Sequence, residues 1–187
     1  LCWGKHVESA RVGEGPSPWR FIDWQRETES CSALTAWYLT SGTFRYGDFV
    51  AETRSAQVST DFFRVLGVDP ALGRNFLTDE GTPYGPVMLS DAFWKRTFRS
   101  DPTIVGAVVE ISGERYEVAG VMPPRFQFPD PGVEFWLAWD MPSVYADRPE
   151  ARTWRFLRVV GRLAPGVSIA AAETDLNRIQ RGLAVAY

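Results

Sequence analysis

The stretch Thr60-Asp-Phe-Phe-Arg-Val-Leu-Gly-Val-Asp-Pro-Ala-Leu-Gly-Arg74 predicts a short helix followed by a proline turn. Ser59 or Thr60 can accept hydrogen bonds from the free amides of the first helical turn. The two phenylalanines and Leu66 are apolar at helical spacing, and Gly67 can adopt the left-handed conformation that ends a helix. The stretch therefore predicts a packing element and carries no catalytic pattern.

An apolar segment and an aromatic-rich segment follow this helix. Residues 86–90 (Pro-Val-Met-Leu-Ser) predict a buried strand, and residues 91–98 predict a helix that Ser90 caps. The run of Thr, Asp, Glu, Gly and Pro at residues 78–86 is typical of a loop. We expect a boundary between two lobes in this loop.

The N-terminal part of the chain predicts two helical pieces. Ser17 and Pro18 form a cap and a first-turn proline ahead of a run rich in aromatic residues. Cys31, Leu34 and Tyr38 then recur at spacings of three and four residues, which predicts a second helical piece.

The middle of the chain predicts strands joined by tight turns. Two hairpins are expected, and their strands cover residues 43–46 with 49–58 and residues 105–111 with 115–121. The first turn contains Gly47, and the second contains Gly113, which can supply the positive φ that such turns require. Residues 133–139 predict one further strand.

The C-terminal part predicts a strand and a long helix. In residues 155–163, the face expected to lie on the core carries Leu157, Val159, Gly161 and Leu163. This strand should pair with part of the first seventy residues. Ser168 then caps a helix whose apolar stripe consists of Ile169, Ala172, Leu176, Ile179 and Leu183. The stripe predicts packing against a sheet, with a partner helix or a stalk toward a membrane as the alternatives.

The composition is that of a folded domain. Of 187 residues, 45% are hydrophobic and 23% are charged. The net charge of -3 gives no general attraction to phosphate backbones, so nucleic acid is not an expected partner. No apolar stretch approaches the roughly 20 residues that span a bilayer, and the first residues lack the features of a signal peptide. The chain alone is expected to be soluble, with any membrane spans outside it.

Catalytic and metal-binding patterns are missing from the sequence. The single histidine, His6, lies in an irregular segment, and no phosphate-binding glycine loop or calcium loop occurs. Cys2 and Cys31 are too few for a structural zinc site. Cys31 is expected to be a buried free thiol that is not paired with Cys2. We therefore predict no enzyme activity, no catalytic, cofactor or metal residues, and no cofactor.

Two alternatives use the carboxylates and tryptophans of the middle segment. A glycosidase would need a pair of carboxylates, and the candidates are Asp79, Glu80, Glu134, Asp140 and Asp147. Trp136 and Trp139 without a carboxylate role would suit a secreted carbohydrate-binding or other ligand-binding module.

The order of several sequence blocks resembles the periplasmic core domain of MacB-like and FtsX-like ABC transporter permeases. Besides the opening stretch, the blocks are Asp23-Trp24, Phe93 to Phe98, Asp101 to Gly106, Ile111 to Pro129, and Arg158 to Glu173. The resemblance runs from about Pro16 to about Leu183 and is closest to the duplicated, orphan type of permease. Cys31 departs from it where an aromatic residue is expected, and residues 141–152 match no block.

This resemblance implies an α+β fold of two lobes. A porter-like α/β lobe would be built from residues 1–78 and 151–187, and a β-rich lobe from residues 79–150. The implied function is that of a non-catalytic extracytoplasmic domain that couples membrane-helix motion to substrate handling or partner docking. Implied partners are the membrane-spanning helices of the same permease, a separate cytoplasmic ATPase subunit and a second permease copy in a dimer. The implied location is the periplasmic side of the bacterial inner membrane.

Overall fold

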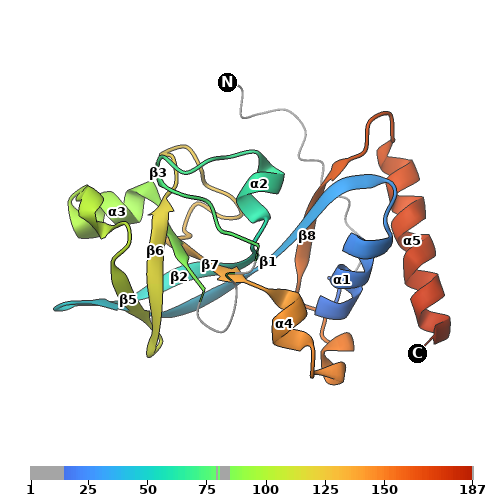
Figure 1. The fold of residues 1–187 in the computed structure, drawn as a ribbon, viewed down its shortest axis with the longest axis horizontal. Coiled ribbons are helices and arrows are strands. Elements are labelled where there is room, and N and C mark those ends of the chain that lie inside the picture. The colour runs from blue at the N-terminus through green and yellow to red at the C-terminus, as the bar shows by residue number, and fades with distance from the viewer. Residues whose placement is uncertain (1–14, 79, 81–84, 187) are drawn as a thin grey trace. The chain divides into compact units, whose positions relative to one another are not determined.

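The computed structural model describes residues 15–78, 80 and 85–186, and its chain divides into two compact units (Figure 1). The described parts of Leu1–Ala36 and Arg148–Tyr187 form the first unit, and Trp37–Asp147 forms the second. Helices and strands are mixed in the chain, which confirms the predicted fold class. The sheet contains parallel as well as antiparallel pairs.

The first unit contains both ends of the described chain. Its elements are α1 (Pro18–Glu27), the start of β1 (Cys31–Tyr46), η2 (Pro149–Arg152), β8 (Arg158–Leu163) and α5 (Ile169–Ala186). Ser17 caps α1 by accepting a hydrogen bond from the amide of Arg20, as its position predicts. Strand β8 pairs with β1, so the predicted pairing of this strand with the first seventy residues is confirmed.

The second unit is built mainly from strands. Its elements are the rest of β1, β2 (Phe49–Ser59), α2 (Phe62–Leu66), β3 (Leu72–Gly73), β4 (Val87–Leu89), α3 (Asp91–Phe98), η1 (Pro102–Ile104), β5 (Val108–Ile111), β6 (Glu114–Val121), β7 (Phe135–Trp139) and α4 (Met141–Tyr145). Both predicted hairpins are present, as β1 with β2 and as β5 with β6. Ser90 caps α3 by accepting a hydrogen bond from the amide of Phe93, as predicted.

The strand pairs of the second unit close into a ring. Among the described residues, the neighbours run β1, β2, β7, β4, β6, β5 and back to β1. The pairs β2–β7 and β4–β6 are parallel, and the others are antiparallel. A closed ring leaves its members without a long open edge.

Two apolar clusters fill the second unit on opposite faces of these strands. One contains Phe44, Phe93 and Phe135, with contributions from β4, β5 and β6. The other contains Phe63 and Trp136, together with side chains from β2 and from the segment after β6. The heavy aromatic content of the sequence is thus largely core packing, with neighbouring rings at edge-to-face angles.

The predicted helical piece at residues 31–38 is wrong, because these residues begin the long strand β1. Apolar spacings of three and four suggested a helix. The backbone instead pairs with β8 and β2, and the segment contains Thr35, Trp37 and Tyr38, whose residue types favour strands. Cys31 has a free thiol, as expected, but it is half-buried and not fully buried. Cys2 lies outside the described residues.

The opening stretch forms its helix with a different start. The N-cap of α2 is Asp61, which makes no capping bond with its side chain, so the predicted cap by Ser59 or Thr60 is wrong. The Ser59 hydroxyl donates to Asp61, and the Thr60 hydroxyl donates to the carbonyl of Thr78. Both side chains are therefore engaged elsewhere. Gly67 ends the helix in the left-handed conformation, as predicted.

The C-terminal predictions hold for the helix and only in part for the strand. On α5, Ala172, Leu176 and Ile179 are buried, as the stripe predicts. On the strand face expected to be core, Leu157 is buried but Leu163 is exposed. Strand β8 ends the strand order with β1 as its neighbour, so its last residues face solvent. The side chain of Leu183 is not among those that the structure describes.

The two compact units do not have the boundaries of the predicted lobes. The units divide between residues 36 and 37 and between residues 147 and 148, and the lobe boundaries after residues 78 and 150 stay a prediction. Residues 37–78 group with the middle of the chain because β2 pairs with β7 and β3 pairs with β6. These pairs join segments that are far apart in the sequence.

Candidate functional site

Two of the acidic residues considered for a glycosidase, Glu80 and Glu134, have separate basic partners. Glu80 forms an ion pair with Arg74 at 2.7 Å and accepts a hydrogen bond from the amide of Leu77. Burial opposes ionisation, but these bonds prevail and lower the pKa of Glu80. Glu134 is paired with Arg96. A general acid requires a raised pKa, so Glu80 is unsuited to that role.

The other described candidates, Asp140 and Asp147, do not complete a pair of carboxylates. Asp140 accepts a hydrogen bond from Ser143, Asp147 is exposed, and Asp79 lies outside the described residues. Within the described chain, no hydrogen bond joins any two of these acidic side chains. The structure thus gives each of the four described carboxylates a separate environment, and no two-carboxylate site is assembled among them.

The two tryptophans considered for a sugar-binding platform are core residues. Trp136 is 0% exposed and Trp139 is 3% exposed. The indole nitrogen of Trp136 donates to the carbonyl of Phe128 at 3.2 Å, and Trp139 packs edge-to-face against Tyr38 and Tyr145. Neither ring presents a flat face to solvent, so the platform built on these two residues is wrong.

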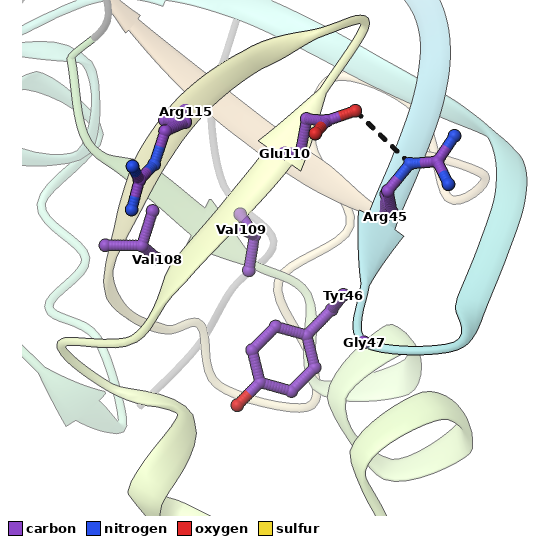
Figure 2. Close-up of a pocket in the computed structure, with 7 residues that line it drawn as sticks. All are labelled: Arg45, Tyr46, Gly47, Val108, Val109, Glu110 and Arg115. Atoms are coloured by element: carbon purple, nitrogen blue, oxygen red, sulfur yellow. Dashed lines mark hydrogen bonds and ion pairs between the residues drawn. The ribbon is translucent and has the colours of Figure 1, made fainter.

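A surface hollow lies in the second unit, beside the tip of the β1–β2 hairpin (Figure 2). Its volume is about 410 Å³, and its lining consists of Arg45, Tyr46, Gly47, Val108, Val109, Glu110 and Arg115. In the pairing register, Glu110 lies opposite both Arg45 on β1 and Arg115 on β6. The Nε atom of Arg45 donates to the Glu110 carboxylate at 3.2 Å.

The polar groups of this hollow do not converge on a common point. Figure 2 shows the guanidinium groups of Arg45 and Arg115 on opposite sides of the strand that carries Val108, Val109 and Glu110. Specific small-molecule sites combine an enclosing apolar lining with polar groups that meet at the ligand. The hollow is therefore a feature of the solvent-exposed surface of these strands, and the Arg45–Glu110 ion pair lies at it.

The most strongly perturbed acidic group in the described chain is Asp175, on helix α5 of the first unit. Burial opposes ionisation, but hydrogen bonds from Arg178, Ser30 and Thr28 hold the pKa of this carboxyl far below its usual range. Asp175 was not singled out from the sequence. The available signal was its position among Ala172, Leu176 and Ile179, which places a carboxylate on the apolar face of the helix.

The described residues form neither a cluster of metal ligands nor a membrane-spanning helix. In the described part of the chain, no three His, Cys, Asp or Glu side chains gather as a metal ion would require. His6 and Cys2 lie outside that part. Within residues 15–78, 80 and 85–186, no helix combines the length and apolar character needed to cross a membrane.

The fold is that of the extracytoplasmic domains of ABC-type transporters. It is similar to the periplasmic region of MacB from Actinobacillus actinomycetemcomitans, with a TM-score of 0.70 and 15% identity over 92% of this chain and 76% of that chain. The extracellular domain of the noncanonic ABC-type transporter YknZ from Gram-positive bacteria gives a TM-score of 0.67 and 14% identity, over 95% of this chain and 89% of that chain. A domain of a putative permease from Porphyromonas gingivalis gives 0.63 and 16%, over 91% and 70%.

The sequence profile of the MacB-like periplasmic core domain matches residues 6–179. The chain therefore belongs to this family, whose members are periplasmic domains of ABC transporter permeases. Among curated proteins, none matches the sequence of this chain at a significant level. The resemblance of the sequence blocks to this family is confirmed. The functional assignment rests on this family match and not on a catalytic or ligand-binding site.

Proposed function

We propose that this domain has no catalytic role and transmits motion between the membrane helices of its permease and the events outside the membrane. Those events are substrate handling or the docking of a partner. The energy comes from a separate cytoplasmic ATPase subunit, and the permease lies in the bacterial inner membrane with this domain on the periplasmic side. A second permease copy completes the proposed assembly.

The observation that carries this proposal is the family match together with the way the last helix is held. Helix α5 packs into the first unit through Ala172, Leu176 and Ile179. We propose that this helix connects to a membrane span of the permease. A packed terminal helix is suited to carry a displacement, because a close-packed interior transmits strain. We further propose that the porter-like lobe of the family includes the first unit.

The test is a distance measurement in the intact permease with its ATPase. One spin label is placed at Glu173→Cys, an exposed position on α5, and the other at the extracytoplasmic end of the membrane helix that follows this domain. We expect the distance distribution to change between the nucleotide-free state and the state trapped during ATP hydrolysis. An ATPase variant that cannot bind ATP should abolish the change. An unchanged distribution in the active assembly would refute transmission through this helix.

A further inference from the structure

The carboxylate of Asp175 collects hydrogen bonds from the turn between α1 and β1. Its Oδ2 atom accepts from the hydroxyl of Thr28 at 3.0 Å, from the amide of Glu29 at 3.2 Å, and from Ser30 through its amide at 3.2 Å and its hydroxyl at 2.8 Å. The Oδ1 atom accepts from Arg178 at 2.8 Å and 3.3 Å. Both oxygens thus accept hydrogen bonds, and Oδ2 accepts all of those that come from residues 28–30.

The same turn is tied to the other elements of the first unit. The amide of Thr28 donates to the carbonyl of Trp24 at the end of α1. The carbonyl of Ser30 accepts from the amide of Ala164, just after β8, at 2.9 Å. The turn therefore meets α1, the start of β1, the end of β8 and the side of α5.

Helix α5 offers no second acceptor at the distance of one turn. Residues three and four positions from Asp175 lie on the same side of the helix, and they are Ala171, Ala172, Arg178 and Ile179. None of these side chains can accept a hydrogen bond. Sliding or rotating the helix by one turn would leave the amides of Glu29 and Ser30 without this partner. Packed helices can otherwise shift by such steps during conformational change.

We propose that Asp175 is the positioning residue that locks α5 in register with the turn at residues 28–30, so that the helix and the start of β1 move as one body. The functional consequence of this inference rests on the proposed function, because α5 and β1, held together, would pass a displacement of α5 on to β1. The lock itself is a property of the chain and is testable without transport.

Cys31 is a built-in reporter of the lock. Its thiol is half-buried and lies 3.9 Å from the hydroxyl of Ser30, so opening of the turn exposes it. We compare Asp175→Asn with Glu173→Gln, an exposed carboxylate two residues earlier on α5, in a Cys2→Ser background. An amide keeps one acceptor oxygen and loses the charge, so it cannot hold both Arg178 and the turn.

We expect maleimide labelling of Cys31 in the folded chain to become roughly tenfold faster in Asp175→Asn, because losing charge-assisted bonds favours local opening. Glu173→Gln should label at the original rate. If Asp175→Asn does not fold, Ser30→Ala removes the hydroxyl bond to the carboxylate together with the hydroxyl contacts to Thr28 and Cys31, and it keeps the amide bond. It should give a smaller acceleration with the fold retained. Equal labelling rates in a folded Asp175→Asn variant would overturn the lock.

The intact permease separates this inference from the proposed function. Spin labels are placed at Arg26→Cys on α1 and Glu173→Cys on α5, both exposed, in a background without native cysteines. With the lock intact, their mutual distance stays constant through the ATP cycle, and Asp175→Asn broadens or shifts it. A cycle-dependent change with Asp175 present would overturn the lock. If α5 does not move relative to the membrane, the proposed function fails while the labelling result still stands.

Discussion

Replacing Ile179 by alanine tests whether the stripe of α5 holds the helix in the first unit. Ile179 is 2% exposed. The substitution removes three carbon groups, worth about 0.8 kcal/mol each in transfer free energy. Adding the cavity left behind gives a loss of about 2 to 5 kcal/mol in the free energy of unfolding, reduced by a few tenths because alanine favours helices. Leu176→Ala should cost less within this range, since Leu176 is 9% exposed.

The assay is urea denaturation of the 187-residue chain, followed by tryptophan fluorescence and by circular dichroism. Asn177→Ala is the matched control, because Asn177 is exposed on the same helix, and it should change stability by less than about 0.5 kcal/mol. A loss below about 1 kcal/mol for Ile179→Ala, with an unchanged denaturant slope, would refute tight packing of the stripe. In the intact permease, the same variant should lower transport more than ATP hydrolysis. Equal loss of both, at equal protein level, would argue against coupling through α5.

Three further predictions concern single features of the chain. Because its hydrogen bonds lower the pKa of Asp175, the stabilisation from this carboxylate is complete above the unfolded-state pKa of about 3.9 and falls as the pH drops below it. Asp175→Asn should therefore cost about 1 to 3 kcal/mol at pH 7 and less at pH 3 in urea denaturation; an equal cost at both values would contradict this. Gly73→Ala should destabilise by at least about 1 kcal/mol, because Gly73 has φ +80° and a Cβ atom would lie 2.1 Å from the carbonyl oxygen of Ala119. Gly182→Ala, with open space around it in a helix, should be neutral or stabilising, and the reverse order of the two variants in thermal unfolding would refute the geometry. Calorimetric titration with zinc, calcium or ATP should give no saturable, stoichiometric binding; a micromolar signal would count against a non-catalytic domain.

Local signals in the sequence predicted the elements whose partners are close along the chain. The hairpins around Gly47 and Gly113, the helix after Ser90 and the last helix all follow from turns, caps and apolar periodicity. Residues 31–38 were mistaken for a helix because their apolar spacing fits either structure. Their long-range pairing with β8 and β2 decides the outcome, and no local pattern reports it.

The closed ring of strands and the boundary of the compact units depend on such long-range pairs. The parallel pairs β2–β7 and β4–β6 join segments separated by loops and helices, and parallel strands have no tight turn that would mark them in the sequence. The carboxylate of Asp175 was missed for the same reason. Its partners at residues 28–30 are more than a hundred positions away, so only the fold shows what a charged residue on an apolar helix face binds.

The stripe and the carboxylate of α5 contribute different physical properties to the same contact. Apolar burial stabilises the helix against its unit, but it is not directional and changes little when side chains slip past one another. Hydrogen bonds to one carboxylate oxygen depend on distance and angle, so they fix the position of α5 along and around its axis. Ile179→Ala should therefore lower global stability while Cys31 labelling in the folded state stays slow. Asp175→Asn should accelerate that labelling with a smaller loss of global stability. A helix that transmits motion needs both stable packing and a fixed register. Ile179→Ala tests the packing, and Asp175→Asn tests the register.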